Sequence, residues 1–297
     1  MAVLPSDPIA AGQLGALIPP PMARRRRASW VRSLDVYIPG GFLLLLVLAC
    51  FVWPVVYPVP QPVGGSILDA SLGIGAPGHL LGTDTVGNDI LARLLYGGRV
   101  SFEVAAATQV VGGVVGTMIG IVSTYLGGIA EAVVMRLLDV LLAIPAFILA
   151  LTLLEGLGQG ELNIIWALSI FFIPAFARLA RAATLSLKEQ TFVVAAHLTG
   201  TKRWRSIMRH IVPNVAPGLL TFALLNAGVA IIIEATLSFF GYGIPPPGPS
   251  WGNMIADGQQ VMSTQPRLIL VPSILLLVTV IALNTLGDGL RARWGVQ

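Results

Sequence analysis

The fold class is decided by one apolar run, Phe42-Leu43-Leu44-Leu45-Leu46-Val47-Leu48-Ala49-Cys50-Phe51-Val52. Nine of its eleven residues are Leu, Val or Phe. Each of these residues favours insertion into a bilayer by about 0.3 to 0.6 kcal/mol, so the run contributes roughly 3 to 5 kcal/mol. A helix needs about 20 residues to cross the hydrocarbon core. The run and its flanks therefore predict a membrane-spanning helix over residues 38–56.

The rest of the chain has the composition of a protein whose solvent is largely lipid. Of its 297 residues, 55% are hydrophobic and only 11% are charged, whereas a soluble domain carries about 25% charged residues. Further apolar runs predict spans over residues 101–125, 134–154, 164–180, 217–239 and 268–286. We expect an all-α integral membrane protein with about six transmembrane helices in residues 37–297, preceded by a mobile arm over residues 1–36.

The distribution of Lys and Arg indicates which side of the membrane each loop faces. If the N-terminus lies inside, the internal segments hold 14 of these residues and the external segments hold 3. Because basic residues favour the cytoplasmic side, we expect a multi-pass protein of the cell membrane with both termini in the cytoplasm. The same placement explains the net charge of +4 and the pI of 9.6 without a nucleic-acid partner.

The internal segment between the fourth and fifth expected spans is too long to be only a connector. It carries two apolar stripes at helical spacing. The first is Phe192, Ala195, Ala196 and Thr199, and the second is Trp204, Ile207, Met208 and Ile211, opposed by Lys202, Arg203, Arg205 and Arg209. Gly200 permits a turn between them. The pattern predicts a pair of amphipathic helices that docks either into a groove on a partner protein or onto anionic lipid.

This segment resembles the coupling loop of ATP-binding-cassette importer permeases. The family pattern is Glu-Ala-Ala, three residues, Gly, nine residues, and an apolar stretch that ends in Pro. Ala195, Ala196 and Gly200 hold the matching positions, and Pro213 closes the motif. Val194 replaces the Glu, a carboxylate that in the family helps to seat the loop on the ATPase. Coupling at this subunit is therefore expected to be weaker, or shared unequally with a partner permease.

The resemblance assigns roles to several residues of the loop. It implies that the ATPase contacts a surface made of Phe192, Val194, Ala195, Ala196, Gly200, Trp204, Arg205 and Pro213.

Three further blocks are similar to one branch of that family. They are Leu81–Ser101, Leu237–Met254, and the ending formed by Gln265–Arg267 and Asn284–Arg291. Their order and spacing resemble the second permease of dipeptide, oligopeptide and nickel importers, from about residue 38 to 295. Asn88 departs from that pattern, because Arg is commoner at its position.

The resemblance implies a mechanism and a set of partners. A second homologous permease would complete the pore for peptides, two separate ATPase subunits would bind ATP and magnesium, and an extracytoplasmic binding protein would deliver the solute. The sequence holds no G-x-x-x-x-G-K-[ST] phosphate loop, so we expect a non-catalytic subunit with no cofactor of its own. The alternatives are a nickel chelate, haem or another small solute as cargo, and a proton-coupled secondary transporter.

Several residues within the expected spans have specific predicted roles. Gly112, Gly116 and Gly120 recur every four residues and predict close helix packing. Glu234 lies deep in the fifth span, where it either lines the translocation pathway or makes an interhelical hydrogen bond. Arg136 and Asp139, three residues apart, predict a mutual ion pair.

The remaining predictions concern the external loop and metals. Ser250 is expected to cap a short helix that begins near Trp251, with the indole at the headgroup level. The three histidines, His79, His197 and His210, lie in different segments. No pair has the spacing of metal ligands, so no metal site is predicted.

Overall fold

The computed structural model describes residues 29–56 and 60–294, and these residues are almost entirely helical. The principal helices are α2 (Ser29–Phe51), α4 (Ile90–Leu126), α5 (Gly128–Leu142), α6 (Ala146–Leu157), α7 (Glu161–Lys188), α10 (Val212–Phe239), α11 (Trp251–Gln260) and α12 (Arg267–Trp294). The short elements are α3 (Trp53–Val56), η1 (Ile67–Asp69), α8 (Thr191–Leu198), α9 (Arg203–Ser206) and η2 (Ile207–Ile211). The expected mobile arm, residues 1–36, lies largely outside the described residues.

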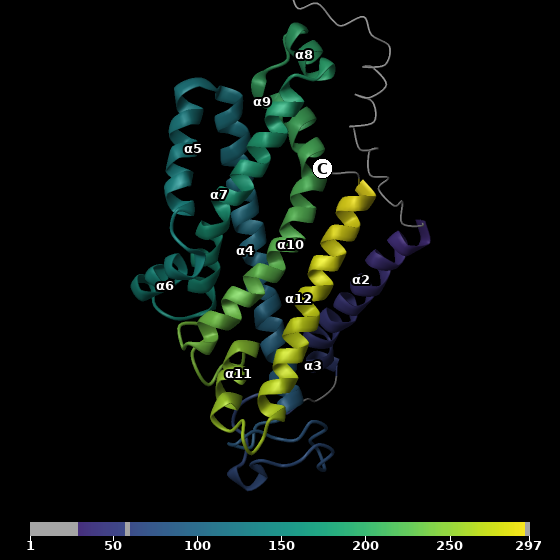
Figure 1. The fold of residues 1–297 in the computed structure, drawn as a ribbon, viewed down its shortest axis with the longest axis vertical. Helices are drawn as coiled ribbons and strands as arrows, with labels where there is room; N and C mark the ends of the chain where they lie inside the picture. The colour runs from purple at the N-terminus through teal and green to yellow at the C-terminus, as the bar shows by residue number, and fades with distance from the viewer. Residues whose placement is uncertain (1–28, 57–59, 295–297) are drawn as a thin grey trace, which may run out of the picture.

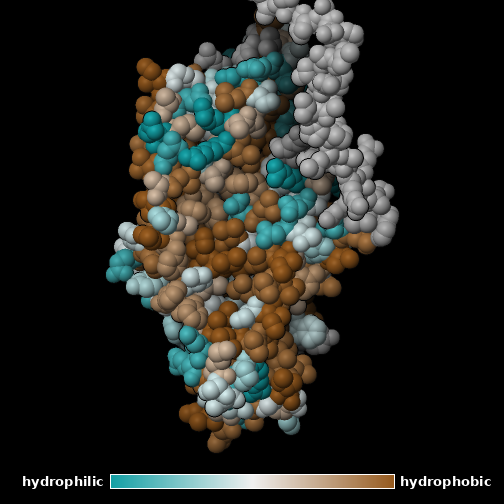
Figure 2. All heavy atoms as spheres, in the orientation of Figure 1, coloured by the Kyte–Doolittle hydropathy of each residue, from teal (hydrophilic) through white to brown (hydrophobic). Residues whose placement is uncertain are grey.

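The long helices run lengthwise in an elongated bundle (Figure 1). α8 and α9 project from one end, and we call residues 191–206 the knob. The other end carries residues 60–89 and 240–266, which include α11 and which we call the cap. α12 begins beside the cap and ends toward the knob, and α2 runs in the opposite direction. Across the middle of the face in Figure 2 the surface is predominantly hydrophobic, as expected for a bilayer-facing belt.

Five of the described helical segments are long and apolar enough to cross a membrane. They are Leu34–Val56, Ile90–Leu126, Glu161–Lys188, Trp204–Phe239 and Arg267–Trp294. Most extend well beyond the expected bounds. The 101–125 span, for example, begins at Ile90, where Asp89 caps the helix by accepting a hydrogen bond from the Ala92 amide at 2.7 Å.

The third expected span, residues 134–154, is not one helix, and this prediction needs correction. α5 and α6 meet at an angle of 89°. The break falls at Ala143–Pro145, because proline lacks the amide hydrogen and disfavours helical conformation in the residue before it. The pair counts as a sixth span only if the two halves are taken together.

α4 and α7 pack closely along a row of small residues. A Cβ added at Gly112 would lie 3.1 Å from the Ser169 carbonyl oxygen, and one at Gly116 or Gly120 would collide with the carbonyl of Ile173 or Ala177. The predicted glycine row therefore lies where the backbone of α4 approaches that of α7, as small residues allow in membrane bundles.

Candidate functional site

The knob is a helical pair folded around Gly200. This residue has a φ of 79°, a left-handed conformation that glycine adopts without steric cost, and nothing lies within 4 Å of its missing side chain. The amide of Thr201 donates to the Ala196 carbonyl at 3.0 Å, which closes the end of α8. Val193 of α8 is fully buried, whereas Leu198 and Gly200 near the turn are exposed. The knob is therefore open at its tip.

Large apolar side chains face outward around this turn. Phe192 is 42% exposed, Leu198 is 84% exposed and Trp204 is 56% exposed. Ala195 and Arg205 are also exposed, whereas Ala196 is half-buried. The side chain of Val194 lies outside the described set. The predicted coupling residues of α8 and α9 thus gather at one end of the molecule, while Pro213 lies in the first turn of α10.

The second predicted stripe is split in the structure. Trp204 and Met208 are exposed, but Ile207 and Ile211 are buried at 5% and 0%. Residues Ile207–Ile211 form a π-helical turn, so the 3.6-residue period on which the stripe was predicted does not hold there. The buried isoleucines pack against Ile121, Ala180 and Val215 instead of facing a partner.

The knob continues directly into α10. α9, the π-turn and α10 follow one another without an intervening loop, and Trp204–Phe239 forms one apolar unit of 36 residues. The ring of Phe192 lies 6.1 Å from that of His210, which links α8 to the π-turn. π-turns inside helices often mark functional positions, and this one lies at the base of the predicted coupling loop.

Two ion pairs join α5 to α7 on the knob side of the bundle. Arg178 Nη2 donates to Asp139 Oδ1 at 2.6 Å, and Arg181 Nε donates to Glu131 Oε1 at 2.6 Å. The predicted pair between Arg136 and Asp139 is wrong. The carboxylate of Asp139 bonds across the helix interface to α7 rather than along its own helix.

Glu234 lies at the opposite end of α10 and is fully buried. Ser101 Oγ donates to Glu234 Oε2 at 2.8 Å, and Ser238 Oγ donates to Oε1 at 2.8 Å. The side chain has no exposed surface, so it does not line an open pathway in this structure. Of the two predicted roles, the geometry favours the interhelical hydrogen bond.

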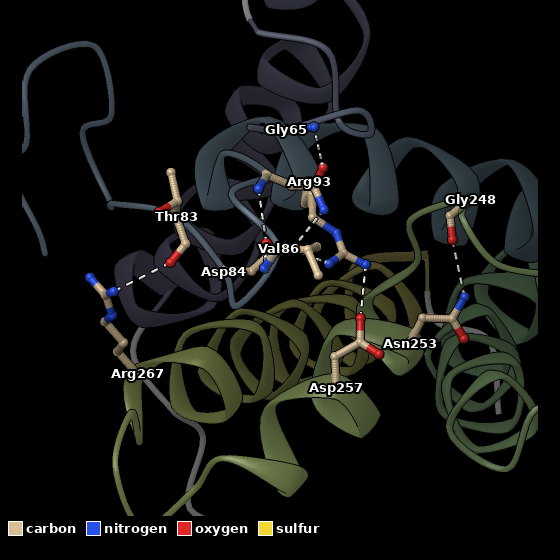
Figure 3. A network of polar contacts seen from close by, with 10 residues as sticks. Gly65, Thr83, Asp84, Val86, Arg93, Gly248, Asn253, Asp257 and Arg267 are labelled. Carbon is tan, nitrogen blue, oxygen red and sulfur yellow. Dashed lines mark hydrogen bonds and ion pairs between the residues drawn. The ribbon is translucent and has the colours of Figure 1, made fainter. Parts of the chain in front are cut away.

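The cap contains an ionic network that the sequence patterns did not reveal (Figure 3). Arg93, only 8% exposed, donates from Nη1 to Asp84 Oδ2 at 2.6 Å and from Nη2 to Asp257 Oδ2 at 2.9 Å. Arg267 Nη2 donates to the carbonyls of Leu72 at 2.5 Å and Thr83 at 3.3 Å. These bonds tie the 60–89 loop to α4, α11 and the start of α12. No local motif relates Arg93 to Asp257, which lies 164 positions away.

Asp84 is the centre of this network. Burial raises the pKa of its carboxyl, but hydrogen bonds from Asn88, Arg93 and Val86 outweigh burial and hold the pKa below its usual value. The amides of Val86 and Asn88 donate to Oδ1 at 3.0 and 2.8 Å. Asp84 is therefore an ionised anchor of the loop at neutral pH.

The helix predicted at Trp251 is present, but the position of the indole differs from the prediction. α11 covers Trp251–Gln260, and Ser250 Oγ accepts from the Asn253 amide at 3.2 Å. Trp251 is fully buried rather than at the headgroup level, because its Nε1 donates to the Leu94 carbonyl at 3.0 Å. Within the described residues, no group of three His, Cys, Asp or Glu side chains could hold a metal ion.

Known proteins resemble this chain in sequence and in fold. Residues 112–293 match the family described as binding-protein-dependent transport system inner membrane component. A glutathione transport system permease protein, GsiD, from Pectobacterium atrosepticum is 37% identical over 268 residues, 89% of this chain and 89% of the relative. The protein of that name from Escherichia coli O6:K15:H31 is 39% identical over 213 residues, 72% of this chain and 70% of the relative.

The fold comparison points in the same direction. A solved structure of the MetNI methionine ABC transporter in an inward-facing conformation superposes with a TM-score of 0.55 and 20% sequence identity. The match covers 67% of this chain and 95% of that one. At this identity the similarity concerns the fold alone.

Proposed function

Because the chain belongs to the family of binding-protein-dependent transport system inner membrane components, we propose that its knob is the surface that couples it to an ATPase. The chain is a permease subunit of an ATP-binding-cassette importer. Permeases of this kind work with ATPase and binding-protein subunits.

The observation that carries the coupling assignment is the exposure of Phe192, Leu198 and Trp204 around the Gly200 turn. Apolar side chains on a short helix supply affinity when they enter a groove on a partner protein. α9, the π-turn and α10 follow one another without an intervening loop, so a force on the knob is carried into α10. If the knob instead binds anionic lipid, changes in the knob would not affect the binding of ATPase subunits.

The cargo that fits best is a small peptide. Two relatives are permeases of glutathione transport systems, and glutathione is a tripeptide. We assign this chain to peptide import on that basis. A nickel chelate, haem or another small solute within the same importer class is the second candidate. A proton-coupled secondary transporter would need no ATPase, so a pull-down of ATPase subunits distinguishes an importer from such a transporter.

The working complex contains this chain, a second homologous permease that completes the pore, two ATPase subunits on the knob side, and a binding protein at the cap. Both termini lie in the cytoplasm in this arrangement. It places the knob, with α8 and α9, on the side where ATP is available, and the cap on the side from which the solute arrives. This chain itself is non-catalytic.

The test is a pull-down of tagged protein in mild detergent with Gly200→Asp against wild type. An aspartate at a φ of 79° strains the turn and places a charge on the apolar tip. Gly241→Asp is the matched control, because Gly241 also has a positive φ of 83° and open space around it but lies in the cap. We expect wild type and Gly241→Asp to retain ATPase subunits and Gly200→Asp to lose them. If wild type purifies without any nucleotide-binding subunit, the coupling assignment is wrong.

A further inference from the structure

Glu234 occupies an unusual position for a carboxyl group in a membrane helix. It lies five residues before the end of α10 at Phe239, and none of its side chain is exposed. An ionisable side chain within a membrane segment is costly, and such residues are retained where they have a specific partner or function. The mechanism proposed above, which concerns the knob, does not use it.

The hydrogen bonds of Glu234 reach α4 directly and the segment before α11 through one intermediate. Ser101, which donates to Glu234 Oε2, belongs to α4. Ser238, which donates to Oε1, lies one turn further along α10, and its Oγ accepts from the Ile244 amide at 3.3 Å. Each serine donates one hydrogen, and a carboxylate can accept several. Glu234 therefore bonds to α4 and, through Ser238, to the segment that leads into α11.

The first turn of α11 fits into a slot that leaves it little freedom. A Cβ added at Gly97 would lie 3.1 Å from Ser250 Cα, and one at Gly98 would lie 2.8 Å from the Trp251 ring. A Cβ at Gly252 would collide with the carbonyl of Ala235, the neighbour of Glu234. The glycines of α4 and α11 thus allow the backbones to approach, and Glu234, next to Ala235 at this contact, bonds to Ser101 of α4.

α10 also connects this contact to the knob. The unit Trp204–Phe239 contains 36 residues, which corresponds to about 54 Å at 1.5 Å per residue of helix. The knob lies at one end of this unit, and Glu234 lies near the other. A displacement applied at the knob is carried along a hydrogen-bonded helix, which is stiffer than a loop.

We propose that Glu234 is a positioning residue for transport: by accepting hydrogen bonds from Ser101 and Ser238, it fixes α10 to α4 and to the segment that leads into α11, so that movement of the knob moves the cap. This inference rests on the proposed function, because it needs an ATPase that moves the knob. Neutralising the carboxyl would leave the knob intact and uncouple the cap.

The experiment uses the complete complex in lipid nanodiscs, with spin labels on Gln260→Cys in α11 and Leu157→Cys at the end of α6. Both native residues are exposed, and the only native cysteine, Cys50, is buried. The label-to-label distance is measured without nucleotide and with ATP plus vanadate. ATPase activity is measured in the same nanodiscs without labels, and glutathione uptake is measured with the unlabelled complex in proteoliposomes.

The variant is Glu234→Gln, and the matched control is Glu155→Gln, which changes an exposed carboxyl on α6. Gln keeps the shape of Glu but replaces one accepting oxygen with a donor, so the serine bonds cannot all persist. We expect the nucleotide-dependent distance change in wild type and Glu155→Gln, and its loss in Glu234→Gln. Uptake per ATP hydrolysed is expected to fall about tenfold, within the usual range of coupling energies, while ATPase subunits stay bound.

Each outcome has one meaning. If Glu234→Gln shows the wild-type distance change and the wild-type ratio of uptake to hydrolysis, the inference is wrong while the proposed function stands. If wild type binds no ATPase or shows no nucleotide response, the proposed function fails and the inference fails with it. Should Glu234→Gln not assemble, Ser101→Ala removes one of the bonds with little change in packing. A wild-type response in Ser101→Ala would also contradict the inference.

Discussion

Arg93 Nη2 donates a hydrogen bond to Asp257 Oδ2 at 2.9 Å, although 164 positions separate the two residues in the sequence. The same guanidinium holds Asp84, and the three side chains join the 60–89 loop, α4 and α11 (Figure 3). The two carboxylates differ in environment, because the Asp84 side chain is 8% exposed and that of Asp257 is 56% exposed. That difference makes the network directly testable.

Removing the guanidinium should cost far more than removing the exposed carboxylate. Arg93→Leu leaves Asp84 as a buried charge without its cation, which typically costs about 3 to 5 kcal/mol of unfolding free energy. Asp257→Asn removes a partner that is half in water, for which we expect at most about 1 kcal/mol. Thermal unfolding of the two variants in the same detergent measures the difference. Equal losses would contradict this prediction, because they would show that Asp257 stabilises the protein more than its exposure suggests.

The cap should lose stability in acid through Asp84. Its pKa in the folded protein is held below the ordinary value of 3.8, so the unfolded chain binds a proton first as the pH falls. The stabilisation is therefore complete above pH 3.8 and is lost between that value and the lower folded pKa. Asp84→Asn should flatten this part of the profile. Melting temperatures of both proteins across the acid range provide the measurement, and parallel profiles would contradict the prediction.

Helix α4 should tolerate a methyl group at Gly113 but not at Gly116, which belongs to the glycine row. A Cβ at Gly116 collides with the backbone carbonyl of Ile173, which cannot rotate away, whereas one at Gly113 lies 3.4 Å from the ring edge of Phe176. Gly116→Ala should therefore destabilise the protein by about 1 to 3 kcal/mol, the usual cost of overpacking. Gly113→Ala is the control and should be nearly neutral. Unfolding in a denaturing detergent series compares the two.

The knob end of the bundle and the cap should be accessible from opposite sides of the membrane. Arg293→Cys places a thiol at the exposed end of α12, which points toward the knob, and Ser263→Cys places one on the exposed cap. In intact cells, an impermeant maleimide should label Ser263→Cys alone, and permeabilisation should add Arg293→Cys. The native Cys50 is buried and provides the silent background. Labelling of Arg293→Cys in intact cells would reverse the orientation predicted from the Lys and Arg distribution.

Apolar run length and residue spacing are sufficient to predict the membrane spans of this protein and its family resemblance. The run Phe42–Val52 required a membrane span, and the spacing of Ala195, Ala196 and Gly200 led to the coupling-loop resemblance. These features are local, since insertion depends on about 20 consecutive residues and a turn depends on one backbone conformation. The family assignment and the helical membrane fold followed from such local patterns and agree with the comparisons.

The start of the second span shows where local patterns fail. Residues 90–100 lie outside the span predicted over residues 101–125, because Arg93 and Arg99 interrupt the apolar pattern there. In the structure this stretch is helical, because Asp84 and Asp257 neutralise Arg93, and Arg99 Nε donates to Glu103 at 2.8 Å. Both partners of Arg93 come from other elements, so only the folded chain brings them within reach.

Local sequence patterns were therefore sufficient to predict the lipid environment, the helices and the loop that resembles a coupling surface. They could not predict which charges are neutralised, that Asp139 pairs with Arg178 rather than Arg136, or that Glu234 joins α10 to α4. Insertion and turn formation depend on residues close in sequence. A buried charge or carboxyl is stable only when partners from distant segments meet it, and their meeting is a property of the packed bundle.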